Sequence, residues 1–244
     1  MAHGNYFLQG NGIVAEPALK VLFEDNHLLV LAKPPGLPTA HGAIRGVSLF
    51  DHAKDYLKHK YNKPGNVYLG LVHRLDQAVS GVVVFARTSK AAARLCEQFR
   101  LGTVQKTYLA ATESPPAPPV GTLRDFLQPL EAEKKVQVSP RAEGAKEAIT
   151  EYQTLLSEAG VTLVKLHPRT GRKHQLRVQL AVRGWPIVGD GKYGAQKKFP
   201  HGIALHGLAI EILHPVTKKA MTFTMLPPLK WLREFGPWVN AVLA

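Results

Sequence analysis

The chain has 244 residues, 45% of them hydrophobic, so it is long enough to bury a substantial core and we expect a globular protein. Its 31 Lys and Arg against 18 Asp and Glu give a net charge of +13, which favours polyanionic partners, nucleic acid ahead of membrane surfaces. The single cysteine, Cys96, excludes an internal disulfide framework and any metal or iron–sulfur site built from several thiolates.

The sequence carries no signal for a membrane or for secretion. No apolar run approaches the ~20 residues that cross a bilayer. The N-terminal sequence MAHGNYFLQGNGIVAEPALK lacks the basic start and apolar segment of a secretory signal. We therefore expect a cytoplasmic protein with no membrane partner, in which residues 1–19 are flexible and residues 20–244 form one folded domain.

The first quarter of the chain predicts two strands and a helix. VLFED and HLLVLAK are expected to be strands, and KPPGLPTAHG, too rich in Pro and Gly for regular structure, is expected to be a loop. Ser48 is expected to cap a helix that runs to about Lys60. VYLGLV and GVVVFAR then predict two buried strands on either side of the polar insert HRLDQAVS.

A second helix is predicted from about Ser89, a candidate cap, to Arg100. Cys96 falls on this helix next to Leu95 and Phe99, so we expect a buried structural thiol. TVQKTYLAAT alternates in polarity, which predicts a strand. The Pro-rich SPPAPPVG is expected to be a loop inside one domain, because no change in composition follows it.

The last part of the chain predicts a hairpin, a short helix and two closing strands. EYQTLLS and VTLVKLHP are expected to pair as a hairpin, and HQLRVQLAVRG to form a helix that stops at Gly184. IALHGLAIEILHP and KAMTFTMLP are the closing strands. Hairpins mixed with segregated helices predict an α+β domain around a mixed, largely antiparallel sheet flanked by helices and loops.

Three short sequence patterns match or resemble known motifs but do not indicate the functions of those motifs. GDGKYG matches the G-x-G-x-x-G pattern of dinucleotide binding, but the segment after it cannot start a long helix, so we expect a turn. HRLD differs from the kinase HRD in residue order and has no accompanying kinase motifs. The histidines lack the H-E-x-x-H spacing of a zinc site, so no metal site is expected.

Three segments carry residues suited to chemistry. HRLDQAVSG supplies a carboxylate, Asp76, and KTYLA supplies a phenol, Tyr108. The segment HPRTGRKHQLR is a cationic loop at a helix start, which suits a phosphate; its basic residues are Arg169, Arg172, Lys173, His174 and Arg177. Charge content alone leaves a solvated basic face equally open, and Arg74 and Asp76 alone would also fit a surface ion pair in a turn.

These segments together resemble the RluA-type pseudouridine synthases. HRLDQAVSG is similar to the H-R-L-D-x-x-T/S-S-G motif of that family, and the resemblance runs from about Val21 to Pro228. The other similar segments are EDNHLLVLAKPPGL, TVQKTYLA, HPRTGRKHQLRVQLAVRGWPIVGDGKYG and LHGLAIEILHP. The chain departs from the family pattern at Val79, Gln179 and Gly207, where Thr, His and Ala are usual. The resemblance is to a short form, without the N-terminal S4-type RNA-binding domain of many relatives.

The resemblance implies an isomerase that converts uridine in tRNA, in rRNA or in both to pseudouridine, without a cofactor or a metal. It implies that Asp76 is the essential carboxylate, acting on the ribose or on the base, and that Arg177 pairs with it. Tyr108 would stack on the uracil or remove the C5 proton. The implied RNA-binding residues are Arg74, Arg172, Lys173 and His174. We expect a monomer with no protein partner.

Two other functions stay open at this point. One is a non-catalytic RNA-binding module of the same fold, which would have no need of Asp76, Tyr108 and Arg177 together. The other is a hydrolase of N-glycosidic bonds, which would also depend on a carboxylate and would release free uracil.

Overall fold

The computed structural model describes residues 19–40, 47–140, 144–158, 160–200 and 202–228, together with 231, 234 and 235. The expected flexible segment 1–19 lies outside this range except for its last residue, as does part of the loop KPPGLPTAHG. None of the helices in the described part of the chain is long and apolar enough to cross a membrane.

The described residues form strands and short helices in irregular alternation. The strands are β1 (Lys20–Glu24), β2 (Leu28–Lys33), β3 (Gly70–Leu71), β4 (Ser80–Ala86), β5 (Gln105–Thr112), β6 (Val120–Leu130), β7 (Lys135–Ser139), β8 (Lys146–Glu158), β9 (Val161–Pro168), β10 (Leu205–Leu213) and β11 (Ala220–Thr224). The helices are α1 (Leu49–Lys60), α2 (Ser89–Leu101), α3 (Gln175–Ala181) and the 3₁₀ turn η1 (Gly191–Tyr193).

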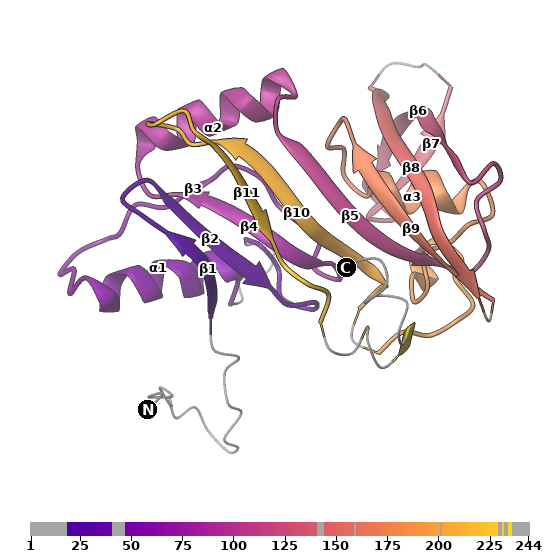
Figure 1. Cartoon of the computed structure of the whole chain (residues 1–244), viewed down its shortest axis with the longest axis horizontal. Helices are drawn as coiled ribbons and strands as arrows, with labels where there is room; N and C mark the ends of the chain where they lie inside the picture. The colour runs from indigo at the N-terminus through magenta and orange to yellow at the C-terminus, as the bar shows by residue number, and fades with distance from the viewer. Residues whose placement is uncertain are drawn as a thin grey trace.

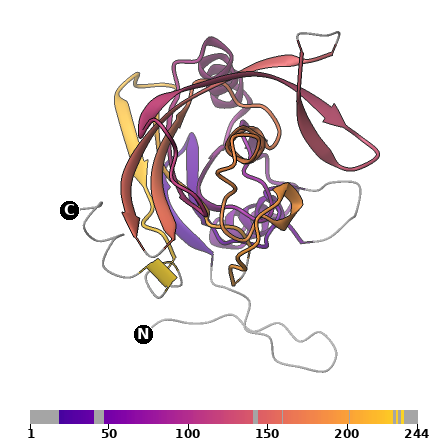
Figure 2. The same cartoon turned by 90° about the vertical axis from the view of Figure 1, so that its right-hand side faces the viewer.

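One sheet holds all the described strands. Its order is β1-β2-β4-β10-β5-β9-β8-β6-β7, with β11 beside β10 and β3 beside β4. Only β4 and β10 pair in parallel, so the predicted α+β fold with a mixed, largely antiparallel sheet is confirmed. Figure 1 shows α1 and α2 beside the strands of one half and α3 beside those of the other. In Figure 2 the strands of this second half curve around α3, which is seen end-on.

The central strands bury both faces of the sheet. Every residue of β2 and β4 is buried, and successive side chains of β4 point to opposite faces. Val82 and Val84 pack with Leu95 of α2, whereas Val83 and Phe85 belong to the core that includes α1 and α3. The two faces are therefore covered by different helices, which leaves the strand ends and loops to form the surface of any site.

The ends of α1 and α2 follow from their sequence. Ser48 caps α1 as predicted, and the capping box is complete, because Ser48 accepts from the backbone of Asp51 and Asp51 accepts from that of Ser48. The predicted cap Ser89 is wrong. Thr88 caps α2, since its backbone is extended and its hydroxyl accepts from Ala91 N at 3.2 Å, whereas Ser89 is already helical.

Two further sequence predictions need correction. VYLGLV is not a full buried strand: only Gly70 and Leu71 pair with β4, and Leu71 is exposed. The thiol of Cys96 is not buried but exposed. Leu95 faces the sheet, and the next residue of a helix points about 100° away from it, out of the core.

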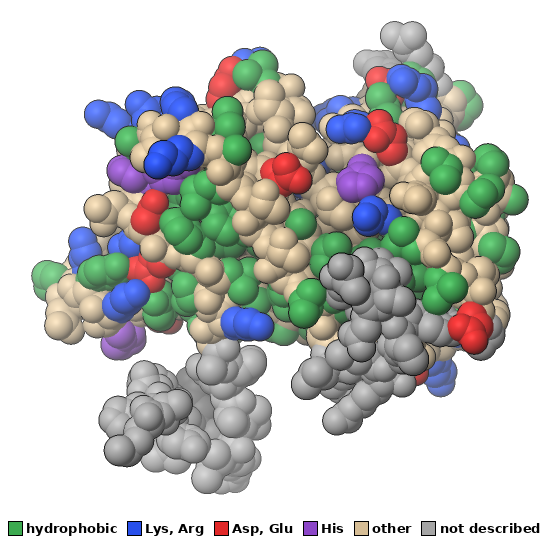
Figure 3. Space-filling view, viewed as in Figure 1, with side chains coloured by type: hydrophobic (Ala, Val, Ile, Leu, Met, Phe, Trp, Pro, Cys, Tyr) green, Lys and Arg blue, Asp and Glu red, His purple; other side chains and the backbone are tan. Residues whose placement is uncertain are grey.

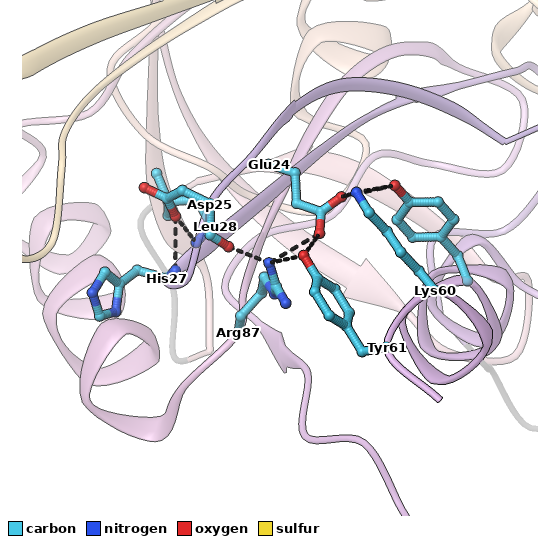
Figure 4. Close-up of polar contacts among 8 residues, drawn as sticks. Glu24, Asp25, His27, Leu28, Lys60, Tyr61 and Arg87 are labelled. Carbon is cyan, nitrogen blue, oxygen red and sulfur yellow. Dashed lines mark hydrogen bonds and ion pairs between the residues drawn. The ribbon is translucent and has the colours of Figure 1, made fainter. Parts of the chain in front are cut away.

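A polar cluster fastens α1 to the sheet (Figure 4). The Glu24 carboxylate on β1 accepts from Lys60 at 2.7 Å, from Tyr56 at 2.7 Å and from Arg87 at 3.0 Å, and also from the hydroxyl of Tyr61. Burial would raise the pKa of Glu24, but the hydrogen bonds from Lys60, Tyr61 and Tyr56 lower it to about 2. Glu24 is therefore ionised in the folded protein and joins the first strand to α1 and to the end of β4.

The parallel pair β4 and β10 requires a glycine at position 81. A Cβ atom on Gly81 would lie 2.5 Å from the carbonyl oxygen of Gly207, and Gly81 has a φ of +142°. A Cβ atom on Gly207 would instead make ordinary contacts of 3.6 Å with Gly81, Leu75 and Tyr108. The departure from the family pattern at Gly207 is thus not forced by the packing.

We expect Gly81→Ala to lower the free energy of unfolding by about 2 to 3 kcal/mol, because the added methyl must push two backbones apart. Gly207→Ala, the matched control, should change it by less than about 0.5 kcal/mol. Urea unfolding followed by circular dichroism measures both. Equal losses in the two variants would contradict the packing argument.

Candidate active site

A cleft of about 520 Å³ opens where the loop before β4, the end of α2, β5 and the start of α3 meet. Six of the predicted site residues line it: Arg74, Asp76, Tyr108, Arg172, His174 and Arg177. Lys173 is exposed and does not line it. Among the described residues there is no group of three or more His, Cys, Asp or Glu side chains that could hold a metal ion.

The loop that carries Asp76 is held by the last residue of β2 and by the segment that follows it. The Thr39 hydroxyl donates to Leu75 O at 2.7 Å and accepts from Leu75 N at 3.1 Å. The fully buried Lys33 donates to Gln77 O at 3.1 Å and to two carbonyls of its own loop. Burial lowers the pKa of Lys33 to about 7, and the charge of Asp76 opposes this. Both neighbours of Asp76 are therefore anchored, while its carboxylate, 23% exposed, remains accessible from the cleft.

Arg177 lies between two carboxylates. Its guanidinium donates two hydrogen bonds of 2.7 Å to Asp190 and one of 3.3 Å to Asp76. Asp190 is buried in the GDGKYG turn, and no role was expected for it from the sequence. The bidentate pair fixes the orientation of Arg177 independently of Asp76. Burial acts to lower the pKa of Arg177, but Asp190 and Asp76 raise it, so the residue stays charged.

His174 is a neutral neighbour of Asp76. Its Nε2 lies 3.7 Å from Asp76 Oδ2, and its Nδ1 lies 2.8 Å from the Tyr193 hydroxyl. That hydroxyl also accepts from Val136 N, which leaves its own proton available to Nδ1, and on this assignment the ring proton lies on Nε2. Burial, followed by the nearby cations, lowers the pKa of His174 to about 4, although Asp76 opposes this. The RNA contact predicted for His174 stays a prediction. At pH 7 a neutral imidazole ring would make this contact.

Tyr108 presents a neutral phenol to the cleft from β5. Burial raises its pKa, and the charge of Asp76 raises it further. Lys106, two residues earlier on the same strand, also lines the cleft, and burial lowers its pKa to about 8. The sequence motif KTYLA singled out the tyrosine alone, so Lys106 is a cation of the cleft that was not predicted.

The helix α3 is buried from Gln175 to Leu180, so its polar side chains need internal partners. Gln175 accepts from Arg172 N and from Thr170, which shapes the turn before the helix. Gln179, a departure from the family pattern, accepts from Thr150 at 2.8 Å and donates to Asp125 at 2.8 Å. The local hydrogen bonding is therefore complete with glutamine at this position.

Several cations stand around the cleft. Arg74 and Arg172 are exposed, and Arg172 donates to Glu147 O at 2.9 Å. Arg169 pairs with Glu151 at 2.7 Å in an exposed bidentate contact. On the face in Figure 3, Lys and Arg side chains lie along the upper edge with Asp and Glu among them. The exposed Arg74, Arg169 and Arg172 thus form a basic rim on the cleft that Asp76 also lines.

A comparison with known proteins identifies the family. The RNA pseudouridylate synthase family model matches residues 27–182. The dual-specificity RNA pseudouridine synthase RluA of Escherichia coli O6:H1 is 35% identical over 211 residues, which cover 85% of this chain and 93% of RluA. The chain belongs to the RluA-type RNA pseudouridylate synthases.

Other members of the RNA pseudouridylate synthase family support the assignment. The RNA pseudouridine synthase YhcT of Bacillus subtilis is 36% identical over 207 residues, which cover 82% of this chain but 65% of YhcT. The solved structure of human RNA pseudouridylate synthase domain containing 4 is 28% identical with a TM-score of 0.73, and the match covers 92% of both chains. The predicted pseudouridine synthase fold is therefore confirmed.

Proposed function

We propose that this chain isomerises uridine in RNA to pseudouridine, with Asp76 as the essential carboxylate. One observation carries the proposal: Asp76 is the one carboxylate among the described residues that line the cleft, and it shares that cleft with Arg177 and Tyr108. The bond from ribose to N1 of uracil breaks, a bond from ribose to C5 forms, the C5 proton is lost and N1 takes up a proton. The product is an isomer of the substrate, so the reaction needs no redox partner.

Arg177 places a positive charge beside Asp76 without binding it tightly. RNA phosphates near the cleft would disfavour a second negative charge, and a guanidinium at 3.3 Å offsets this. Because Asp190 takes the two shorter hydrogen bonds of Arg177, the contact with Asp76 is single and longer. The carboxylate is thus not held in a tight ion pair and is free to react with the ribose or the base.

Tyr108 suits stacking on the target uracil. The raised pKa keeps the phenol protonated at neutral pH, so a phenolate that could take the C5 proton is disfavoured. A flat, neutral ring beside the carboxylate would hold a uracil turned out of its helix. Arg74, exposed at the cleft, is placed to contact the displaced backbone, and Arg172, Lys173 and His174 would position the RNA.

The proposed substrates are uridines in tRNA, in rRNA or in both. The dual specificity in the name of the relative RluA, 93% of whose length this chain covers, supports action on more than one kind of RNA site. We further propose that residues 20–244 act as one catalytic domain, because a single sheet runs through it, and that the protein works as a monomer in the cytoplasm.

Mapping pseudouridines in tRNA and rRNA from cells with and without the gene tests the function. Selective chemical labelling of pseudouridine is required, since the modification does not change the mass. We expect one or a few positions to lose the label, and the purified protein to restore it on an unmodified transcript. An unchanged map together with inactive protein would overturn the proposal, and release of free uracil would show a hydrolase instead.

A further inference from the structure

Lys106 is a cation of the cleft to which the reaction above assigns no part. On β5 it stands two residues before Tyr108, so both side chains project from the same face of the sheet, about 7 Å apart along the strand. Both line the cleft. If Tyr108 stacks on the target uracil, the ammonium group of Lys106 lies within reach of the backbone beside that nucleotide.

The hydrogen bonding of Lys106 is incomplete. Its Nζ donates to Thr170 O at 3.2 Å, in the turn between β9 and α3. A Lys ammonium has three N–H donors, so two remain without a partner among the described residues. A Cβ atom on Gly171 would lie 3.8 Å from Nζ, so the turn leaves room there that a larger residue would partly fill.

Lys106, like the exposed Arg74 and Arg172, has no carboxylate partner among the described residues, but unlike those two arginines it is half-buried. Within the described ranges, each of the following has an acidic partner: Arg100 with Glu97, Arg169 with Glu151, and Arg177 with Asp190 and Asp76. For Lys106 only burial shifts the pKa, and no nearby carboxylate offsets it. Half-buried charges are normally paired, so one left open in a cleft is suited to a ligand of opposite charge.

We propose that Lys106 binds the RNA phosphate next to the target uridine and so helps to hold the flipped nucleotide against Tyr108. This proposal rests on the proposed function. It makes Lys106 a binding residue that fixes the position of the backbone, separate from the exposed cations of the rim.

The proposal predicts a pH dependence of RNA binding. Lys106 carries its charge below a pKa of about 8 and loses it above, so affinity should fall as the pH rises from 7 to 9. Two neighbouring groups, His73 and His167, have pKa values lowered by burial, the first to about 3, and stay neutral in this range. The charged groups facing this end of the cleft are Arg100, Glu151 and Arg169. A Lys106 variant retains Lys33 and Cys96, which also lines the cleft. Comparison with that variant therefore removes any contribution of these two residues to the pH dependence of RNA binding.

The experiment measures the affinity of a fluorescein-labelled nonauridylate by anisotropy, at pH 7 and pH 9 in low salt. In this probe every register places a uracil over Tyr108 and a phosphate near Lys106. We expect the dissociation constant of the unaltered protein to rise about five- to tenfold between the two pH values. Lys106→Met should bind about tenfold more weakly at pH 7 and show little further change at pH 9. The exposed Lys90→Met is the matched control and should behave like the unaltered protein.

Two further measurements separate binding from a structural role. Lys106→Arg stays charged, so it should bind as tightly at pH 9 as at pH 7, which mere support of the Thr170 turn would not produce. If Lys106→Met does not fold, a nonauridylate with neutral methylphosphonates at its central linkages replaces the variant, and the unaltered protein should bind it weakly and without the pH dependence. An unchanged affinity and pH profile in Lys106→Met, or with the methylphosphonate probe, would overturn the proposal. Absence of pseudouridine formation by the unaltered protein would instead contradict the proposed function.

Discussion

Replacement of Asp76 with Asn should abolish pseudouridine formation while RNA binding survives. The amide keeps the shape of the carboxylate and its place beside Arg177, but it can neither attack carbon nor take a proton. We expect the single-turnover rate to fall on the order of 10³-fold or more. Removing a negative charge from a cleft that receives phosphates should leave RNA affinity unchanged or slightly higher.

The measurement is the rate of appearance of chemically labelled pseudouridine in a transcript with excess enzyme, beside RNA affinity by filter binding. Asp55→Asn is the matched control, because Asp55 is exposed on α1 and does not line the cleft. It should keep full activity. Appreciable product from Asp76→Asn would show that the essential carboxylate lies elsewhere, and a parallel loss of affinity would point to a binding role.

Much of the fold follows from local patterns. The buried strands β2 and β4 correspond to the apolar runs HLLVLAK and GVVVFAR, and α1 starts at the predicted capping serine. The pattern failed at β3, where VYLGLV lies at the sheet edge and pairs over two residues only, so that Leu71 remains exposed. A run of apolar residues predicts burial on average, but it does not show where the sheet ends.

Of the candidate site, the sequence predicted the residues proposed to react but not all of those around them. Asp76 and Arg177 are 101 residues apart in the sequence, and motif resemblance rather than periodicity placed them together. The sequence did not predict a role for Asp190 or Lys106. Burial of a charged side chain depends on tertiary packing, which leaves no periodic pattern in the sequence. The same holds for α3, whose polar residues look solvent-facing in sequence but lie inside the curved half of the sheet.

Arg177→Met should cost far more stability than the loss of a surface ion pair. Asp190 is only 1% exposed, and removal of the guanidinium takes away the cation that donates its two short hydrogen bonds. Asp76, a second carboxylate, also loses its positive neighbour. Breaking one side of a buried pair typically costs about 3 to 5 kcal/mol. Because Arg177 also contacts Asp76, the proposed essential carboxylate, pseudouridine formation should be lost as well. Arg124→Met breaks the exposed pair with Glu147 and is the matched control, expected to cost less than about 1 kcal/mol.

The loss of stability in Arg177→Met should depend on pH, and the direction of this dependence identifies the cause of the loss. Without the cation, burial and mutual repulsion favour the protonated form of at least one of the two carboxylates in the folded state. A group whose pKa is raised by folding contributes stability at low pH that disappears as the pH rises. Urea unfolding should therefore show a smaller deficit at pH 5 than at pH 7.5, while Arg124→Met differs little between the two. If the loss of stability did not depend on pH, its cause would be the loss of side-chain packing by Arg177. The uncompensated charges of Asp190 and Asp76 would then not be the cause.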